Sequence, residues 1–385
     1  MKLPEYMAKA LFDKFGIPTM RGCLINSADN IAEQIEAAGL AYPVVIKAQV
    51  QIGGRGKAGG IQFAQNADEA MAHCTRLLGS ELLGYRVDQL LVVEKAEHGR
   101  EWYLSILLDR LSKQPMVIFS EMGGMEIEQT AKTDPGRIKK LLIDPMIGVQ
   151  EYQARYLLSA SGLPMEYAGQ LDALLRNLYR AFMEKDALLV EINPLAVDQD
   201  NKLVALDGKV DIDDSALYRQ PDILAYRDGM REEDFVKEAR SFNFLYIPVE
   251  KGGTIAVVSN GSGMLMSCID MIARDSMTVG AALDLGGGAT ADRICEAMRI
   301  MFATPYIKAV LINIFGGITR CDEVAGGVKM AFEKYDLGDK LVVIRMEGTN
   351  KEQGLQIIQS LSGNVIPVAG MRESMAALVE RRGRL

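Results

Sequence analysis

The first half of the chain alternates short apolar runs with segments of helical period, a pattern that predicts a mixture of strands and helices. Met7, Leu11 and Phe15 recur every four residues and predict a short helix, which Gly16 and Pro18 end. Further strands are predicted at 44–46, 90–93, 103–108, 116–119, 188–192 and 203–206, a helix before residue 39, and two helices between 150 and 185. This half is therefore expected to be an α+β domain.

The second half alternates more strictly between strand and helix. Five apolar runs, at 254–259, 281–285, 308–315, 341–346 and 365–369, are separated by helical stretches. Short apolar strands joined by helices predict an α/β domain with a parallel, doubly wound sheet. Charges cluster over 216–244 and strand alternation disappears there, which indicates a linker or bridging helix. We therefore divide the chain into a domain at 1–230, a linker at 231–245 and a domain at 246–385.

The composition of the 385 residues excludes several classes of protein. Hydrophobic residues make up 49% and charged residues 24%, which is ordinary for a globular chain of two or three domains. The net charge of -8 disfavours nonspecific nucleic-acid binding, and no apolar run is long enough to span a bilayer. The start is unlike a secretory signal, and the five cysteines form no CxxC motif. We therefore expect a cytoplasmic protein with reduced thiols.

A glycine-rich loop follows the strand predicted at 44–46. Residues 53–60 read GGRGKAGG, and glycines at this density let backbone N–H groups approach an anion closely. Arg55 and Lys57 add positive charge, and Lys47 lies where the preceding strand ends. The loop lacks the GxxxxGK[ST] pattern of a Walker A motif. By itself it fits a phosphate site and a solvated surface hairpin equally well.

Two polar motifs lie near the ends of apolar runs later in this half. The first is EINPL at 191–195, and the second is LDGK at 206–209. If the two runs pair as neighbouring strands, Asn193 and Asp207 converge. An amide oxygen and a carboxylate suit Mg²⁺ that keeps waters and bridges nucleotide phosphates. The alternative for Asp207 alone is an ordinary Asp-Gly turn.

Three glycine turns follow successive strands of the second domain. They read NGSG at 260–263, DLGGGAT at 284–290 and NIFGGITRCD at 313–322. Parallel strands bring such turns to one sheet edge, where helix N-termini favour anions. Each turn alone is also compatible with a tight strand-to-helix connection. Together they indicate an edge that binds a ligand or a partner.

Side-chain nucleophiles with supporting context are scarce. The chain has two histidines, of which His73 lies in a helical stretch and His98 in a turn-like Glu97-His98-Gly99 segment. No Ser/His/Asp or Cys/His arrangement is evident. Cys321 follows Arg320, which can lower a thiol pKa, but a quiet thiol is the favoured interpretation.

In this order and spacing, the motifs GGRGKAGG, GGMEIE at 123–128, EINPL, LDGK, NGSG, DLGGGAT and NIFGGITRCD resemble the beta-subunit family of succinyl-CoA synthetases. The resemblance covers essentially the whole chain. It implies an ATP-grasp domain in the first half, with the nucleotide held between two subdomains. It implies a flavodoxin-like CoA-ligase domain in the second half.

The resemblance also implies roles for particular residues. Lys47 and Gly54-Arg55-Gly56 would contact phosphates, and Asn193 and Asp207 would ligate Mg²⁺. Glu94 would meet the base or the hinge backbone and Glu101 the ribose of ATP or GTP. Glu97 is placed with them, in a stretch one residue shorter than the family pattern. Asn260 and the Gly317-Ile318-Thr319 turn would touch the organic acid, and Glu191 would steady a phosphohistidine.

The implied reaction joins an acid to CoA at the expense of a nucleoside triphosphate, through an acyl phosphate and a phosphohistidine. In the family, that histidine and the CoA site belong to an alpha subunit, so an alpha partner is expected. Ser262, Met264 and Thr319 stand where the family commonly has alanine, leucine and often valine. They lie beside the acid, so succinate is the default substrate and malate or a substituted succinate an alternative.

Two hypotheses of other classes compete with a ligase subunit. A stand-alone, amide-forming ATP-grasp enzyme would share the first half but would leave the NIFGGITRCD edge without a role. A non-catalytic nucleotide-binding scaffold would have no need for Lys47, Asn193 and Asp207 together. The sequence therefore favours the ligase subunit.

Overall fold

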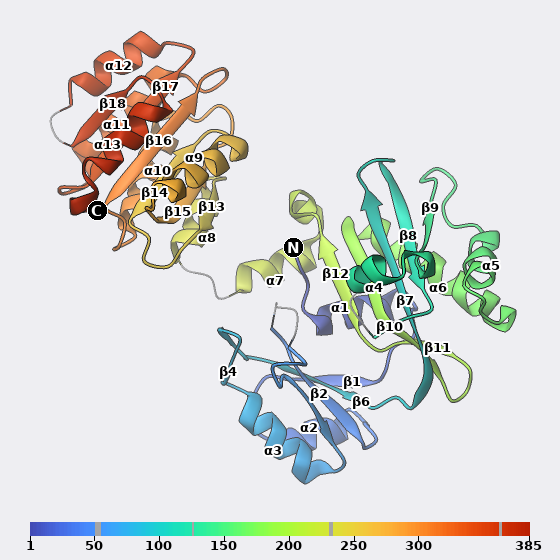
Figure 1. Ribbon diagram of the computed structural model, residues 1–385. Helices are drawn as coiled ribbons and strands as arrows, with labels where there is room; N and C mark the ends of the chain where they lie inside the picture. Colours follow the sequence, from blue (N-terminus) through green and yellow to red (C-terminus); the bar gives the residue numbers. More distant parts are fainter. Residues whose placement is uncertain (51–54, 125–126, 231–233, 362–363) are drawn as a thin grey trace. The chain divides into compact units, whose positions relative to one another are not determined.

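The computed structural model describes the chain except for residues 51–54, 125–126, 231–233 and 362–363. Its contacts divide the chain into two units, Met1–Gly229 and Met230–Leu385 (Figure 1). In the first unit, two antiparallel sheets with separate cores define what we call the small lobe and the large lobe.

The small lobe is a four-stranded sheet in the order β1-β6-β2-β3. α2 and α3 lie on one side of this sheet (Figure 1), and their apolar residues close the core of the lobe. Its elements are β1 (Gly22–Ile25), α2 (Ile31–Ala37), β2 (Val44–Ala48), β3 (Ile61–Ala64), α3 (Ala67–Leu77), β4 (Glu81–Leu82), β5 (Tyr85–Arg86) and β6 (Leu90–Glu94).

The large lobe is a sheet in the order β11-β10-β7-β8-β9, with β12 also paired to β10. Its core takes residues from α1, α5 and α6. Its strands are β7 (His98–Asp109), β8 (Gln114–Ser120), β9 (Lys139–Leu142), β10 (Ala187–Asp198), β11 (Leu203–Ala205) and β12 (Gly208–Ile212). Its helices are α1 (Glu5–Lys14), α4 (Ile127–Thr133), α5 (Glu151–Ala160) and α6 (Ala168–Glu184), and α7 (Pro221–Gly229) ends the unit. Short 3-10 helices lie at Pro135–Arg137, Met165–Tyr167 and Asp214–Arg219.

Strand β10 pairs with two partners in succession along one of its edges. Its first half pairs with β12 and its last residues pair with β11, both antiparallel. The change of partner falls at Asn193 and Pro194, where the pairing with β7 also shifts register. Proline has no N–H for a sheet and is tolerated at such an irregularity. The EINPL motif therefore lies in the middle of a twelve-residue strand rather than at its end.

The second unit contains one sheet in the order β13-β15-β14-β16-β17-β18, parallel except for β13. Numbered along the chain from β14, the parallel strands run 2-1-3-4-5, so the expected flavodoxin-like fold is confirmed. The strands are β13 (Leu245–Pro248), β14 (Ile255–Ser259), β15 (Val279–Asp284), β16 (Ala309–Phe315), β17 (Leu341–Glu347) and β18 (Val365–Val368).

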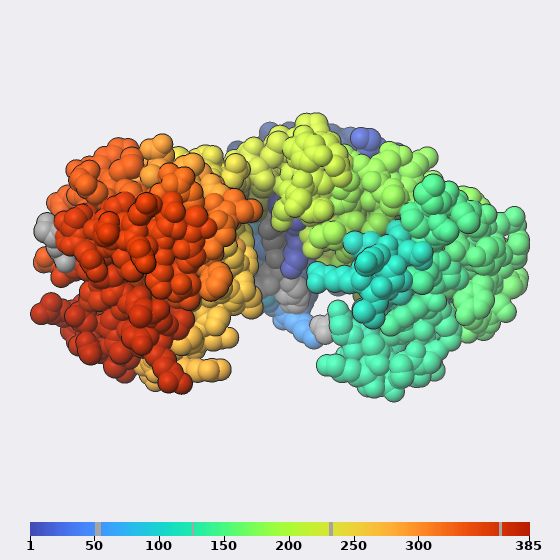
Figure 2. All heavy atoms as spheres, turned by 90° about the horizontal axis from the view of Figure 1, so that it is seen from above, coloured from blue at the N-terminus to red at the C-terminus, as the bar shows by residue number. Residues whose placement is uncertain are grey.

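Helices cover both faces of this sheet. α9 and α13 share one core with it, and α8, α10, α11 and α12 share the other. In the space-filling view, the atoms of this unit, gold to red, form one closely packed body (Figure 2). The helices are α8 (Asp234–Ser241), α9 (Ser262–Arg274), α10 (Ala291–Ala303), α11 (Cys321–Lys334), α12 (Lys351–Gln359) and α13 (Met371–Val379), and a 3-10 helix follows at Arg382–Arg384.

The segment expected to be a linker, 231–245, differs from a plain connection. From Asp234 onward it forms α8 and enters β13, which pairs antiparallel with β15. Ala239 of α8 is buried in the core of this unit, and Glu238 of α8 forms an ion pair with Arg299 of α10. β13 is a four-residue edge strand that buries only Tyr246, so it leaves little hydrophobic pattern in the sequence.

The two helices predicted between 150 and 185 are confirmed as α5 and α6. α6 buries six residues of helical spacing, among them Leu174, Leu178 and Phe182, against the large sheet. Its remaining positions are polar or partly exposed. Among the helices that the described residues form, none is both long and apolar enough to cross a bilayer.

We predict that Leu178→Ala destabilises the first unit by about 2–5 kcal/mol, because a fully buried leucine leaves a cavity when it is truncated. Trp102, the single tryptophan, is buried in the same core and reports unfolding in urea by its fluorescence. Leu111→Ala is the control, since Leu111 is 94% exposed and its truncation is expected to cost under about 0.5 kcal/mol. Equal effects of the two substitutions would contradict the assigned core.

Candidate nucleotide and acid sites

A cavity of about 430 Å³ opens between the two lobes of the first unit. It is lined from the small lobe by Val50, Arg55, Gly56 and Ile61, and from the large lobe by Lys2, Leu3, Pro4, Glu5, Glu191, Asn193, Asp207, Gly208 and Lys209. The structure therefore gathers five of the residues singled out in the sequence, namely Arg55, Gly56, Glu191, Asn193 and Asp207. Gly54 lies outside the described residues.

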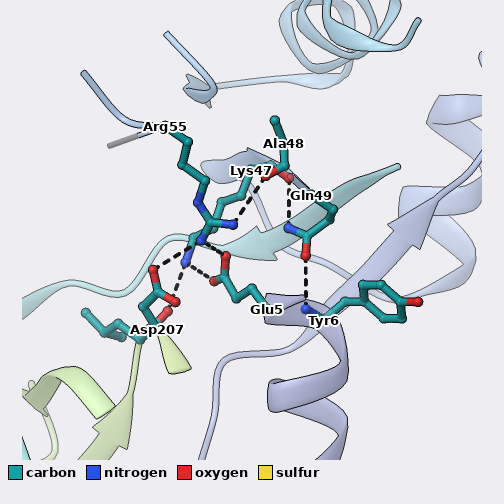
Figure 3. A network of polar contacts seen from close by, with 8 residues as sticks. Glu5, Tyr6, Lys47, Ala48, Gln49, Arg55 and Asp207 are labelled. Atoms are coloured by element: carbon teal, nitrogen blue, oxygen red, sulfur yellow. Dashed lines mark hydrogen bonds and ion pairs between the residues drawn. The ribbon is translucent and has the colours of Figure 1, made fainter. Parts of the chain in front are cut away.

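Two cations of the small lobe project toward the large lobe beside this cavity (Figure 3). Lys47, at the end of β2, is buried, and its Nζ donates to Glu5 Oε1 at 2.6 Å and to the Leu206 carbonyl at 2.9 Å. Arg55 donates through Nη1 to the Ala48 carbonyl at 3.2 Å. Its Nη2 pairs with Glu5 and lies 3.3 Å from Asp207 Oδ2. Burial and hydrogen bonding thus hold both cations at fixed positions.

Glu5 is a residue of this candidate site that the sequence reasoning missed. It begins α1, directly after Pro4, and its side chain is only 5% exposed. Acidic residues are common in the first turn of a helix, because they interact favourably with the helix dipole. The residue type of Glu5 therefore gave no sign of a second role. A buried carboxylate needs charged or hydrogen-bonded partners, and Lys47 and Arg55 supply them.

Asp207 lies between β11 and β12, opposite the irregularity in β10. The Asn193 backbone N–H donates to the Asp207 carbonyl at 3.3 Å, so the expected pairing of the two motifs is confirmed. Burial, and then the nearby Glu5 carboxylate, raise the pKa of Asp207 to about 6, while Lys47 and Arg55 oppose that rise. The site thus brings two carboxylates and two cations together.

Asn193 and Asp207 offer the kind of oxygen ligands that Mg²⁺ prefers. Asn193 Oδ1 accepts from the Gly124 N–H at 2.8 Å, which orients the amide. Gly124 adopts a φ of 75°, which favours glycine. No group of three His, Cys, Asp or Glu side chains suited to a metal occurs among the described residues. An amide and one carboxylate are nevertheless a suitable set for Mg²⁺, which keeps several waters and adds phosphate oxygens.

Glu191 lines the same cavity from β10. Tyr103 on β7 donates its hydroxyl to Glu191 Oε2 at 3.0 Å, which fixes the carboxylate. Burial, and secondarily the Glu191 charge, raise the pKa of Tyr103 well above its usual range, so the phenol stays protonated and remains a donor. The other Glu191 oxygen, Oε1, accepts no hydrogen bond from the residues that the structure describes, so it can meet a group that enters the cavity.

The other three glutamates named from the sequence do not line this cavity. Glu94, at the end of β6, accepts from the Ala41 N–H at 2.9 Å and pairs with Arg21. Glu101 contacts His98 Nε2 at 2.6 Å, and Glu97 accepts from Gln199 at 2.5 Å. Glu97 and His98 line a separate hollow of about 570 Å³ with 3-10 helix and β10 residues such as Glu166 and Val197.

In the second unit, hydrogen bonds join the three glycine turns at one sheet edge. The Asn260 amide donates to the Phe315 carbonyl at 2.9 Å and accepts from the Phe315 N–H at 3.1 Å. This double contact joins β14 to β16, where the strand order reverses and ligands of such folds bind. Ser262 Oγ donates to Asp284 Oδ2 at 2.6 Å and joins the first turn to the second.

The third turn combines a buried residue with an open backbone. Thr319 is buried, and its Oγ1 accepts from the Gly288 N–H at 3.1 Å, so its side chain holds the turns together. Ile318 is 84% exposed, and no described atom lies within 4 Å of a Cβ built on Gly317. The 317–318 backbone is therefore accessible to a ligand, whereas the Thr319 side chain is occupied.

A row of polar residues, of which all but Arg345 are buried, runs across the sheet beneath these turns. Asp284, Ser259, Asn313 and Arg345 are lateral neighbours on β15, β14, β16 and β17. Arg345 donates to Asn313 Oδ1 at 3.2 Å, and the Asn313 amide donates to Cys268 Sγ at 3.3 Å. The sequence analysis did not identify this row, because each member stands alone among apolar residues of its own strand.

The structure also tests the predictions made for Cys321 and the two histidines. Cys321 is buried, and burial raises the pKa of its thiol, so the quiet interpretation is confirmed. His73 lies on α3 as expected. His98 begins β7 and bonds Glu101, so its assignment to a turn is wrong. The reason is that the strand starts before the apolar alternation does.

The fold and the cavity define a two-part protein, an ATP-grasp unit followed by a CoA-ligase unit. The ATP-grasp domain family matches residues 2–197 and the CoA-ligase family matches residues 258–379. The succinate–CoA ligase [ADP-forming] subunit beta of Chloroflexus aurantiacus is 42% identical over 387 residues, covering 100% of both chains. That of Desulfatibacillum aliphaticivorans is 39% identical, covering 99% of each. The chain belongs to this family of succinate–CoA ligase beta subunits.

A solved structure supports the same fold at lower identity. An ATP citrate lyase from Methanothrix soehngenii, in complex with citrate and coenzyme A, superposes with a TM-score of 0.76. The two chains are 20% identical, and the match covers 98% of this chain and 99% of the other. At this identity the likeness concerns the fold alone.

We predict that Gly208→Ala destabilises the first unit by about 1–3 kcal/mol, the usual effect of overpacking. A Cβ at this position would lie 2.3 Å from Cε2 of Phe12, whose ring packs on the backbone beside Asp207. Gly169→Ala in α6 is the control, because no described atom lies near its Cβ and alanine favours a helix. Urea unfolding followed by Trp102 fluorescence compares them, and an unchanged midpoint for Gly208→Ala would contradict the packing.

Proposed function

We propose that this chain is the nucleotide-binding beta subunit of an ADP-forming ligase that joins succinate, or a related dicarboxylate, to CoA. The overall reaction is succinate + CoA + ATP ⇌ succinyl-CoA + ADP + phosphate, through an acyl phosphate and a phosphohistidine. One observation carries the proposal: Lys47 and Arg55 of one lobe face Asn193 and Asp207 of the other beside one cavity. The names of the similar beta subunits support it.

Lys47, Arg55 and the Gly56 backbone would bind the nucleotide phosphates. Phosphoryl transfer depends on positioned cations and N–H dipoles more than on a side-chain nucleophile. Asn193 and Asp207 would hold Mg²⁺, which when bound neutralises phosphate charge. Glu94, Glu97 and Glu101 would meet the base and ribose. The contacts of Glu94 with Arg21 and the Ala41 N–H support a role in orienting the backbone near the base.

The phosphorylated histidine and the CoA site would come from an alpha subunit. Neither His73 nor His98 lines the cavity beside Arg55. His73 lies on α3, and His98 contacts Glu101. Glu191, fixed by Tyr103 and open to the cavity, would accept a hydrogen bond from the partner's imidazole and steady it. A protonated phenol keeps that carboxylate in one orientation.

The acid would bind at the glycine turns of the second unit. The Asn260 amide, which still has a donor hydrogen free after its two bonds to Phe315, and the 317–319 backbone would contact it. The α9 N-terminus, which starts at Ser262, would favour the anionic phosphoryl group. All five cysteines are free thiols, which supports a cytoplasmic complex.

A second candidate differs only in the acid. The Ser262 hydroxyl bonds Asp284 where the family commonly has alanine, so this edge carries an added polar contact. That observation favours a test of malate and substituted succinates beside succinate. The CoA-ligase match over residues 258–379 counts against a stand-alone amide-forming enzyme.

Co-expression with an alpha partner, followed by an acid panel with ATP and GTP, tests the proposal. We expect the purified chain alone to bind Mg-nucleotide without turnover, and the complex to release phosphate only with both acid and CoA. Full acid- and CoA-dependent turnover by the single chain would contradict a subunit role. Nucleotide binding without any turnover across the panel would favour the scaffold alternative.

Asp207→Asn is expected to lower kcat/KM of the complex by roughly 100-fold or more, since even residues behind a metal ligand typically contribute 10–100-fold. The Mg²⁺ concentration needed for half-maximal rate should rise with it, because a neutral amide binds the cation less well than a carboxylate. Asp200→Asn is the control, an exposed carboxylate on the same segment whose loss should change neither value. A wild-type Mg²⁺ requirement in Asp207→Asn would remove Asp207 from the metal site.

A further inference from the structure

We infer that Glu5 is a positioning residue, which holds the two phosphate-binding cations of the small lobe in register with the metal ligands of the large lobe. The inference rests on the proposed nucleotide site and adds a residue to it. Its first observation is that Glu5 and its two cationic partners come from different lobes. Lys47 and Arg55 come from the small lobe, whereas Glu5 begins α1, which packs in the core of the large lobe. The Glu5 contacts therefore cross between the lobes, as Figure 3 shows.

One carboxylate serves both cations. Oε1 accepts from Lys47 Nζ at 2.6 Å, and Oε2 pairs with Arg55 Nη2. The side chains of Glu5, Lys47 and Arg55 are 5%, 9% and 14% exposed, so water provides little screening of these ion pairs. A buried cation that loses its carboxylate must move toward water or another partner. Glu5 thus fixes the separation and the direction of the two cations.

The backbone of α1 is held rigidly enough to act as this reference. Phe12, Leu11 and Ala8 are buried in the core of the large lobe. The Phe12 ring lies against Gly208, the residue that follows Asp207. Glu5 and Asp207 are therefore mounted on elements in direct contact. Cations held by Glu5 are automatically placed relative to the metal ligand Asp207.

Binding of phosphates does not require Glu5 to release the cations. The Lys47 ammonium has three donor hydrogens, and Glu5 and the Leu206 carbonyl use two of them. The Arg55 guanidinium has five donor hydrogens, which it directs to the Ala48 carbonyl, Glu5 and Asp207, the last at 3.3 Å. If Asp207 ligates Mg²⁺ instead of pairing with Arg55, that donor would be free for a phosphate oxygen. Each cation can therefore donate one N–H to the ligand while it stays bound to Glu5.

The alternative is that Glu5 competes with phosphates for the two cations. The two roles predict opposite signs. Loss of a positioning residue weakens nucleotide binding, because the cations leave their places. Loss of a competing anion strengthens it, because the cations become available. A purely structural carboxylate would change neither.

The test is Glu5→Gln in the complex with the alpha partner, with Mg-ADP binding measured by calorimetry and KM values measured for MgATP, acid and CoA. We expect the Kd for Mg-ADP and the KM for MgATP to rise about ten-fold or more, since a charged hydrogen bond commonly contributes that factor. The KM values for acid and CoA should stay within two-fold of wild type. Glu5→Asp, which keeps the charge one methylene shorter, should lie between wild type and Glu5→Gln.

Asp13→Asn is the matched control. Asp13 is a carboxylate on the same helix whose side chain is 49% exposed and pairs with Lys9, so its loss should leave all four constants unchanged. If Glu5→Gln does not fold, Glu5→Asp carries the test alone. Unchanged or tighter Mg-ADP binding in the folded Glu5 variant would overturn the inference.

The two proposals fail in different ways. A wild-type complex that binds Mg-ADP but turns over no acid would overturn the proposed function, and the Kd comparison would still decide the role of Glu5. A wild-type complex that binds no Mg-ADP would overturn both. A selective rise in the nucleotide constants, with acid and CoA constants unchanged, supports the positioning role.

Discussion

The first unit depends on mutual neutralisation of four charged groups between its lobes. Lys47 and Arg55 carry two positive charges into a site with little exposure to water, and Glu5 and Asp207 carry two negative charges against them. Lys47, Arg55 and Glu5, which are 14% exposed or less, would be strongly destabilised there without their partners. The arrangement therefore joins the two lobes and brings together the residues that we propose to bind phosphate and Mg²⁺. Glycine at 208 allows it, because Phe12 of α1 packs directly on that backbone.

The candidate site of the second unit depends on topology instead of charge. Reversal of strand order between β14 and β16 leaves the ends of these strands side by side, and Asn260 spans them through the Phe315 backbone. Thr319 and Ser262 bind the second turn from either side. Three glycine turns that are separate in the sequence thus become one rigid edge. A rigid edge presents backbone N–H groups to an anion without the entropic cost of ordering three loops.

Elements with strong apolar periodicity could be predicted from the sequence, and elements at sheet edges could not. The helix with Leu174 and Leu178 and the five parallel strands were predicted because they bury many regularly spaced side chains. β13 buries only Tyr246, and β1 buries only its last residue, Ile25. Both strands therefore lack an alternation of apolar and polar residues that could be predicted from the sequence. The segment given to a linker contains α8, which buries Ala239 in the core of the second unit and pairs with Arg299, a residue 61 positions from Glu238. Such a contact leaves no local trace.

By itself, the sequence determined which chemical groups this protein possesses: a cationic glycine loop, amide and carboxylate oxygens, three glycine turns and only two histidines. Those features depend on residue type and short spacing, so they can be read along the chain. Only the tertiary structure decided which groups share a site. Glu5 meets Lys47 across 42 positions, and Arg55 meets Asp207 across 152. Contacts at these separations follow from how the two lobes pack, and for that reason the residue that links the cations to the large lobe became visible only in the folded chain.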